Sequence, residues 1–233
     1  MNRIYYAIGD IHGELTKLRL LHDKISNHHS KFYSDRPHTR IHLGDYVDRG
    51  PESCGVINYI QSLDDDKSFD VINLQGNHEI MMLEAHQTSN KTALRHWLVN
   101  GGEQTIESYK AQLSSHDFEK HRDWASKLPT LYADDARKLI FVHAGIDPDT
   151  YPEDEKVVHL WTRKPVFFES EHWTNPALQG TKVIHGHTPT LTDYPEISKD
   201  GRRINLDTGA CYGGPLTAVV LAQDEKPLFL FSD

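Results

Sequence analysis

Short runs of apolar and β-branched residues alternate along the chain with longer segments in which apolar residues recur every three or four positions. Runs of the first kind are typical of strands, and segments of the second kind are typical of helices. Helical spacing is seen at Leu15, Leu18, Leu21 and Ile25, and again from Val56 to Leu63. The alternation predicts an α/β fold, with strands at residues 4–8, 40–43, 70–74, 139–142, 182–185, 203–206, 216–221 and 227–231.

The middle of the chain is more purely helical in its spacing, from about residue 79 to residue 127. Gly101 and Gly102 predict a break in this region, and Pro129 predicts its end. The late strands follow one another with few helices between them, so we expect a second sheet packed on the first. We find no repeat and no linker, and a chain of 233 residues is long enough for one core. We therefore expect a single domain over residues 1–233.

Composition excludes several classes of protein. The formal net charge is -9 and we find no basic stripe, which argues against nucleic acid as a partner. The sequence contains no run of about 18 apolar residues, the length that a helix needs to cross a membrane. The first residues have the pattern of a strand and not of a signal peptide, and two cysteines, Cys54 and Cys211, make no disulfide framework. We expect a soluble, cytoplasmic protein.

Histidine is abundant, with 16 copies, but most of them need no special explanation. Several lie in polar stretches and are expected to be exposed surface side chains: His28, His29, His86, His116 and His121. The acidic pairs and triplets near residues 64–66 and 134–135 are likewise expected to be solvated turns.

The unusual polar residues come directly after predicted strands. Asp10 and His12 follow the strand at 4–8, and Asp45 follows the strand at 40–43. The strands at 70–74, 139–142 and 182–185 are followed in the same way by Asn77, His143 and His187. In open α/β sheets, sites gather at the carboxyl ends of strands. Residues far apart in the sequence are therefore expected to share one pocket.

These six side chains offer oxygen and nitrogen donors and no thiolate. Such a set suits Mn, Fe, Zn or Co better than a soft metal. Six donors exceed what one catalytic ion with open positions would take, but two divalent ions could share them if one carboxylate bridges. We assign the bridge to Asp45, and Mn²⁺ is the metal we expect first. Two adjacent ions could activate a water for in-line attack on phosphorus, so no protein nucleophile would be needed.

Phosphoryl transfer places negative charge on equatorial oxygens, which an arginine can bind. Arg49 is the first candidate for this role, and Arg163 is the second, with a surface cation as its alternative. His78 could donate a proton to the leaving oxygen, and the carboxylate of Asp48 could hold it protonated and oriented. The alternative for His78 is a hydrogen-bond donor beside the metals.

With these residues, the chain resembles the phosphoprotein phosphatase family of metallophosphoesterases, particularly its bacterial and phage serine/threonine protein phosphatases. Five motifs carry the resemblance, in the order of the family and from the start of the chain to about residue 190: Gly9-Asp10-Ile11-His12-Gly13, Gly44-Asp45-Tyr46-Val47-Asp48-Arg49-Gly50, Gly76-Asn77-His78-Glu79, His143-Ala144-Gly145 and Gly186-His187-Thr188.

The resemblance implies a calcineurin-like fold, a central β-sandwich flanked by helices with the site at its edge. It implies that Asp10, His12 and Asp45 hold one metal, and that Asp45, Asn77, His143 and His187 hold the other. Arg49, Arg163 and Asn77 match positions that bind the substrate phosphate, and His78 with Asp48 matches the acid pair. His185 and Glu14 stand where the eukaryotic enzymes have Arg and Gln, which indicates the bacterial branch. Whether His185 lies beside the metals is left undecided by the sequence.

Three functions follow from this pattern. The first is a metal-dependent phosphomonoesterase that acts on phosphorylated serine or threonine in a phosphoprotein or phosphopeptide, with phosphotyrosine as a secondary target. The alternative is a symmetrical dinucleoside tetraphosphate hydrolase, since such enzymes share most of these motifs, although Asp48 favours the phosphatase. A non-catalytic phosphate-binding or metal-binding module is the third. We infer no regulatory subunit from the sequence.

Overall fold

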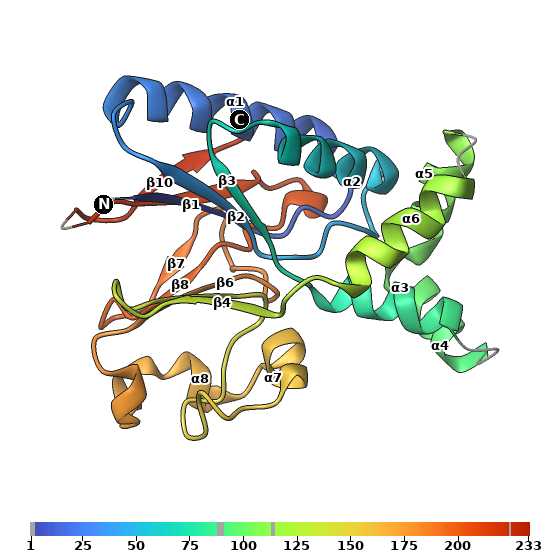
Figure 1. The fold of residues 1–233 in the computed structure, drawn as a ribbon. Coiled ribbons are helices and arrows are strands. Elements are labelled where there is room, and N and C mark those ends of the chain that lie inside the picture. Colours follow the sequence, from blue (N-terminus) through green and yellow to red (C-terminus); the bar gives the residue numbers. More distant parts are fainter. Residues whose placement is uncertain (1–2, 88–90, 113–114, 224) are drawn as a thin grey trace.

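A computed structural model describes residues 3–87, 91–112, 115–223 and 225–233, and contains two five-stranded sheets packed face to face (Figure 1). The first sheet has the order β10 (Leu228–Phe231), β9 (Thr217–Leu221), β1 (Ile4–Ile8), β2 (His38–His42) and β3 (Asp70–Asn73). The second has the order β4 (Leu131–Asp134), β5 (Leu139–Val142), β6 (Lys182–His185), β8 (Arg203–Asn205) and β7 (Glu196–Ile197).

Helices cover the outer faces of both sheets (Figure 1). Over the first sheet lie α1 (Leu15–Phe32) and α2 (Ser53–Ser62), and beneath the second lie α7 (Lys156–Trp161) and α8 (Pro165–Phe168). A separate group of helices at one side contains α3 (Asn77–Gln87), α4 (Lys91–Trp97), the π-helix η2 (Leu98–Gly102), α5 (Glu103–Ala111) and α6 (Ser115–Ser126). Short 3-10 turns complete the described elements: η1 (Leu63–Asp65), η3 (Ser170–His172), η4 (Pro176–Leu178) and η5 (Ala210–Tyr212).

The alternation of side chains along β1 shows how the core is built. Tyr5 and Ala7 join the cluster between the two sheets, with Phe141 and Ile204 from the second sheet. Ile4, Tyr6 and Ile8 point the other way and pack beneath α1 and α2. Successive strand residues face opposite sides of a sheet, so one five-residue strand contributes to two hydrophobic layers.

The fold is the one expected from the sequence, with helices and two packed sheets. All eight predicted strands are present, with ends that differ by at most two residues. The strands β4 and β7 were not predicted. β4 has only four residues, all of them partly buried, which is too short for a clear alternating pattern. β7 has only two residues and pairs with β8 at the edge of the sheet. Gly101 breaks the helical region as expected, with a φ of 106°.

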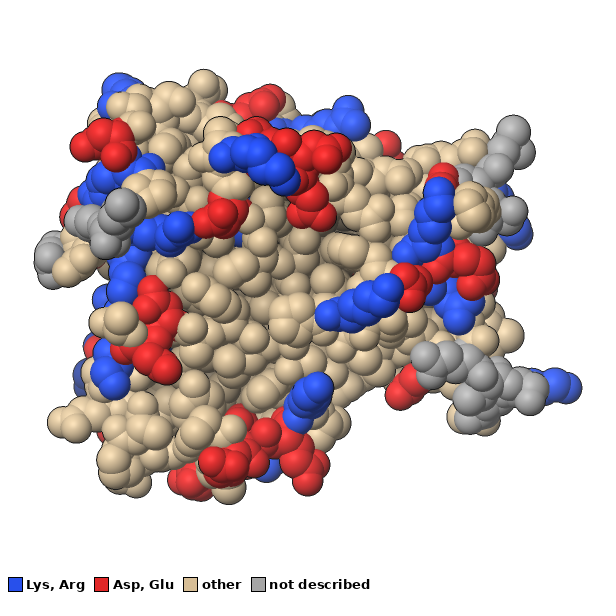
Figure 2. All heavy atoms as spheres, in the orientation of Figure 1, with Lys and Arg blue, Asp and Glu red and all other residues tan. Residues whose placement is uncertain are grey.

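The surface in Figure 2 shows Lys and Arg interspersed with Asp and Glu among the described residues on that face. The cations there do not form a continuous stripe. None of the helices in the described part of the chain is long and apolar enough to cross a membrane.

The parallel pairs explain where a site can form. β1 and β2 run parallel in the first sheet, and β5, β6 and β8 run parallel in the second. The loops that follow these strands meet at one end of the sandwich, where His187 N donates a hydrogen bond of 3.0 Å to Asp10 Oδ2. Residues separated by more than 170 positions are thereby brought into contact.

Candidate metal centre

Asp45 lies at the centre of the loops that follow the strands. Its Oδ1 lies 3.4 Å from His143 Nε2, and its Oδ2 lies 3.4 Å from His12 Nε2. The two carboxylate oxygens thus face two different histidines. The backbone N–H of His78 donates to Oδ1 at 3.0 Å and fixes the orientation of the carboxylate. A carboxylate held in this way can bridge two cations, as the sequence predicts.

His12 and His143 are oriented by backbone carbonyls. Nδ1–H of His12 donates to the carbonyl of Val47 at 2.8 Å, and Nδ1–H of His143 donates to the carbonyl of Leu43 at 3.0 Å. Burial lowers the pKa of both rings, that of His12 to about 3. A neutral imidazole with its proton on Nδ1 presents the lone pair of Nε2. Both Nε2 atoms face the centre, as metal-binding histidines do.

Asn77 provides an oxygen on which two more nitrogen atoms converge. Its Oδ1 lies 2.8 Å from His143 Nε2 and 2.9 Å from His187 Nδ1. Since His143 already donates from Nδ1, its Nε2 lone pair and the Asn77 oxygen are two acceptors in contact. Two facing lone pairs are favourable when a cation lies between them and unfavourable otherwise.

Asp10 completes the group with an oxygen that has no partner. Its Oδ2 accepts from His187 N, whereas its Oδ1 is buried without a hydrogen-bond partner among the described residues. Burial raises the pKa of Asp10, and the negative charges of Asp207 and Asp45 add to that effect. A Cβ on Gly186 would lie 1.9 Å from Asp10 Oδ1, so only glycine allows this carboxylate into the site.

The donor set fits divalent cations. Two groups of three residues have ligand atoms within 4.8 Å of one another, namely His12 with Asp45 and His78, and Asp45 with His143 and His187. Asp45 belongs to both groups. The orphaned oxygen of Asp10 and the facing lone pairs at Asn77 are the features that a cation would satisfy. His and Asp residues are therefore placed to bind metal ions, whereas the identity of the metal stays a prediction.

His78 occupies a position that suits two roles. Its Nε2 lies 4.0 Å from Asp45 Oδ2, which is why it joins the first metal group. Its Nδ1 hydrogen-bonds to Asp48 Oδ2 at 2.7 Å. Burial alone would lower the pKa of His78, but the carboxylates of Asp45 and Asp48 outweigh it and raise the pKa above its usual value. A raised pKa is what a proton donor needs.

Asp48 is fully buried and held by more donors than the sequence indicated. Trp97 Nε1 donates to both carboxylate oxygens, at 2.9 and 3.0 Å, and Thr105 Oγ1 donates to Oδ1 at 2.7 Å. Burial raises the pKa of Asp48, and these hydrogen bonds with that to His78 oppose the increase. No role was assigned to Trp97 from the sequence. A tryptophan has one polar atom, and the sequence does not show where it points.

We expect Trp97→Phe to weaken the site through Asp48. The change keeps most of the buried ring but removes a hydrogen bond to a charged group, worth about 1.5–3 kcal/mol. The free energy of unfolding from urea titration should fall by at least that amount, and kcat should fall about 10-fold as His78 loses its fixed partner. Trp124→Phe is the matched control, because Trp124 packs on Tyr46. Equal losses of kcat in both variants would contradict the role of Trp97.

Glu79 holds the two loops of the site together. Its carboxylate accepts hydrogen bonds from the backbone N–H groups of Asp45, Tyr46 and Gly76, all between 2.8 and 2.9 Å. It is fully buried, and burial followed by the charge of Asp45 raises its pKa to about 8. The sequence motif contained Glu79 without a role. Its position on the first turn of α3, directed back to the preceding loop, could have indicated one.

Asp207 is a buried carboxylate that the sequence analysis missed. It lies two positions after the end of β8 and is 4 % exposed, and burial raises its pKa to about 6. Its Oδ1 accepts from Gly209 N at 3.2 Å, and it interacts electrostatically with Asp45 and Arg49. The rule that polar residues after strands meet at one site, applied to the predicted strand at 203–206, would have found it.

The two arginines lie on different sides of the centre. Arg49 NH1 donates to His12 Nε2 at 2.7 Å. Burial lowers the pKa of Arg49, but the carboxylate of Asp45 outweighs that effect, and the pKa of Arg49 is raised. Arg163 follows α7, is exposed, and its NH2 donates to the carbonyl of His187 at 3.3 Å. Both guanidinium groups adjoin metal-ligand candidates, which is where a phosphate would be bound.

The structure gives the place of His185, which the sequence left open, and contradicts the surface position expected for His121. His185 is buried, and its ring nitrogens contact the carbonyl of Gly186 and NH1 of Arg203, each at 3.0 Å, so it belongs to neither metal group. His121 is not a surface residue: it is 2 % exposed and hydrogen-bonds Tyr109 and Asn58. Its helix lies against α5, and periodicity alone did not show that contact.

Strained backbone is concentrated at the site. Five residues other than glycine have a positive φ there: His12, Asp45, Asp48, Arg49 and His187. This left-handed conformation costs about 1–3 kcal/mol for such residues and persists only where the surroundings impose it. This backbone conformation turns each side chain inward after its strand. The hydrogen bond from Asp45 N to the carboxylate of Glu79 helps to hold the strained backbone in place.

Comparison with known proteins agrees with this geometry. Residues 5–220 match the calcineurin-like phosphoesterase family, and the chain therefore belongs to that family. It is 29% identical over 233 residues to an asymmetrical bis(5'-nucleosyl)-tetraphosphatase PrpE of Bacillus cereus, an alignment that covers 92% of this chain and 89% of that protein. It is 28% identical over 209 residues to a symmetrical bis(5'-nucleosyl)-tetraphosphatase of Hamiltonella defensa, with 84% and 68% covered.

A solved structure of a protein serine/threonine phosphatase from Saccharomyces cerevisiae superimposes with a TM-score of 0.63 at 14% identity, covering 99% of this chain and 79% of that one. At that identity it shows the shared fold alone. The family resemblance expected from the sequence is thus confirmed at the level of the metallophosphoesterases. The two sequence relatives are named as tetraphosphatases, whereas the protein phosphatase is a distant structural neighbour.

Proposed function

We propose that this protein is a metal-dependent bis(5'-nucleosyl)-tetraphosphatase. The alignment over 92% of the chain with a relative of that name carries the choice of substrate. The centre around Asp45 supports the reaction class. Asp48, which favoured a phosphatase in the sequence, carries less weight than similarity along nearly the whole chain.

We assign Asp10, His12 and Asp45 to one metal and Asp45, Asn77, His143 and His187 to the other. Two divalent cations held there, with Mn²⁺ as the first choice, would polarise the phosphoryl oxygens and lower the pKa of a water. Arg49 and Arg163 bind and orient the phosphate oxygens, and Asn77 adds an amide to that side. His78 gives its proton to the leaving oxygen, while Asp48 holds the ring in position.

A phosphoprotein phosphatase is the second candidate, and the acid pair favours it. A serine alkoxide is a much poorer leaving group than a nucleotide phosphate, so its departure depends more on a proton donor. The hydrogen bond of 2.7 Å between Asp48 and His78 provides such a donor. The two candidates therefore share one centre and differ in what lies around it.

A comparison of substrates tests the proposal. The purified protein, loaded with Mn²⁺, is offered bis(5'-adenosyl) tetraphosphate and a phosphoserine peptide at equal concentration. We expect the dinucleotide to be cleaved with the higher kcat/KM and a chelator to abolish the activity. Chromatography of the products separates two molecules of ADP, from symmetrical cleavage, from ATP with AMP. Preferential cleavage of the peptide would reject the tetraphosphatase and support the second candidate.

Two aromatic side chains beside the centre are candidates for stacking on a nucleobase. Tyr212 is 66% exposed, with the guanidinium of Arg49 5.6 Å from its ring centroid. Trp161 is 37% exposed, and its ring lies 6.2 Å from that of His187. Exposed aromatic faces at a phosphate site suit a substrate that carries bases.

Trp161→Ala should therefore raise KM for the dinucleotide. Stacking of one base is worth about 1–3 kcal/mol, which corresponds to an increase of roughly 5-fold to 150-fold. The rate with p-nitrophenyl phosphate, which has no base, should stay within about 2-fold. Trp161→Phe is the control, because it keeps an aromatic face. The same loss with both substrates would show that Trp161 maintains the centre and does not bind a base.

A further inference from the structure

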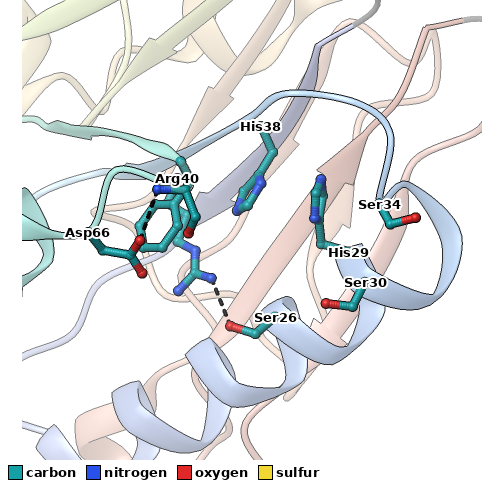
Figure 3. Close-up of a pocket in the computed structure, with 9 residues that line it drawn as sticks. Ser26, His29, Ser30, Ser34, His38, Arg40 and Asp66 are labelled. Carbon is teal, nitrogen blue, oxygen red and sulfur yellow. Dashed lines mark hydrogen bonds between the residues drawn. The ribbon is translucent and has the colours of Figure 1, made fainter.

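A second cavity lies far from the metal centre, between α1, the beginning of β2 and the loop that precedes β3 (Figure 3). Its volume is about 290 Å³. His38, in its wall, begins β2, whereas Asp45 follows the other end of the same strand. The five residues of β2 span about 16 Å, so the two sites lie at opposite ends of this strand.

Arg40 is the charge at the centre of this cavity. It is 4% exposed, its NH2 donates to Ser26 Oγ at 2.8 Å, and its guanidinium lies 3.9 Å from the ring centroid of Phe69. Its Nε has no hydrogen-bond partner, and no carboxylate of the described residues lies within 4.0 Å of it. A buried cation without an ion pair is costly and therefore rare.

His38 is a second unpartnered group in the same wall. It is 5% exposed, and neither ring nitrogen has a hydrogen-bond partner within the described parts of the chain. Its ring lies between His29, with centroids 3.9 Å apart, and Phe69, with centroids 5.1 Å apart. Burial, and next the charges of His29 and Arg40, lower the pKa of His38 to about 3. The wall therefore holds one buried positive charge, Arg40, on which the carboxylates of Asp66 and Asp23 act only electrostatically, and a neutral ring whose nitrogens have no hydrogen-bond partner among the described residues.

We propose that this cavity binds a phosphate group, either free phosphate or a phosphate monoester. The guanidinium of Arg40 offers a fork of donors, and His38 offers one ring N–H. The hydroxyl of Ser30 projects from α1 into the same space (Figure 3). Donors from three sides suit a tetrahedral oxyanion better than a planar carboxylate. The volume exceeds that of a single phosphate, which leaves room for the group that a monoester carries.

Among the described residues, Asp66 is the one acid in the cavity wall, and its charge limits anion binding there. Its Oδ1 accepts from Ser68 N at 2.9 Å, and its side chain is exposed at the rim. Its negative charge opposes an anion. Asp66→Asn should therefore tighten phosphate binding several-fold.

Ser26 allows a direct test, because it contacts Arg40 and lies on the exposed side of α1. Ser26→Asp places a carboxylate beside the guanidinium and should compete with the ligand, whereas Ser26→Asn has the same shape without the charge. Isothermal titration of the metal-loaded full-length protein with inorganic phosphate should show two sites in the wild type and in Ser26→Asn. In Ser26→Asp the second site should weaken at least 10-fold, with unchanged hydrolysis of p-nitrophenyl phosphate.

Titration with AMP separates the two sources of the phosphate group. If the wild type binds AMP at the second site and Ser26→Asp does not, the cavity takes a phosphate monoester. If the second site binds inorganic phosphate but not AMP, the cavity takes the free ion. Equal titrations of Ser26→Asp and Ser26→Asn with both ligands would overturn the proposal. Phosphate binding that becomes weaker in Asp66→Asn would also overturn it, because removal of a negative charge from the wall cannot weaken the binding of an anion there. Neither result depends on which substrate the metal centre hydrolyses.

Discussion

Asp45→Asn should reduce the metal content of the purified protein from two divalent ions per chain to one or none. It should also lower kcat/KM by about 1000-fold or more, since metal ions supply several kcal/mol of stabilisation and each 1.36 kcal/mol corresponds to a factor of 10. The reason is geometric. One carboxylate oxygen faces His143 and the other faces His12, each at 3.4 Å. Asparagine keeps one oxygen and replaces the other with an NH₂ group, which cannot bind a cation.

Elemental analysis by mass spectrometry measures the metal directly, so this prediction does not depend on the substrate. Asp64→Asn is the matched control, because Asp64 is exposed in η1 and outside both metal groups. It should bind metal and hydrolyse p-nitrophenyl phosphate as the wild type does. Two ions per chain in Asp45→Asn would show that Asp45 does not bridge, whatever happened to the activity.

The second large effect concerns the proton donor. His78→Asn should lower kcat by about 10² to 10⁴, the usual contribution of general acid catalysis, and leave KM within about 3-fold. The raised pKa of His78, caused by Asp45 and Asp48 against the effect of burial, keeps the ring protonated to higher pH than an ordinary histidine. The loss should be larger with phenyl phosphate than with p-nitrophenyl phosphate, because the poorer leaving group depends more on a donated proton.

Metal content decides between the two roles that the geometry allows for His78. If it is the acid, His78→Asn retains two ions per chain. If it is a ligand, as its place in the group with His12 and Asp45 permits, the metal content falls and both aryl phosphates slow equally. His172→Asn, a change at an exposed histidine, should affect neither quantity.

Most of the fold could be predicted from the sequence because its strands are strongly apolar and its helices strongly periodic. Where an apolar pattern is short or weak, the sequence alone did not predict the element or the burial of its side chains. β7 has two residues and exists because it pairs with β8, so its stability is entirely tertiary. His121 looked solvated from its polar neighbours, but Tyr109 and Asn58 surround it in the folded helical group.

The candidate site followed from one local rule, that polar residues after strands share a pocket. The rule brought together Asp10, Asp45, Asn77 and the histidines correctly in space. It was not applied to the strand at 203–206, and Asp207 was missed for that reason. Trp97 shows a different limit, because a ring in a helix can be a packing group or a hydrogen-bond donor, and only its surroundings distinguish the two.

The sequence by itself determined the class of chemistry. Donor types, their order and their positions after strands are local properties, and they specified a metal-dependent phosphoesterase centre. The tertiary structure decided which atoms meet: the opposed oxygens of Asp45, the orphaned oxygen of Asp10 and the buried charge of Arg40 in its separate cavity. Burial and partnership depend on segments distant in the sequence, and they, rather than residue identity, set the pKa and the orientation of each group.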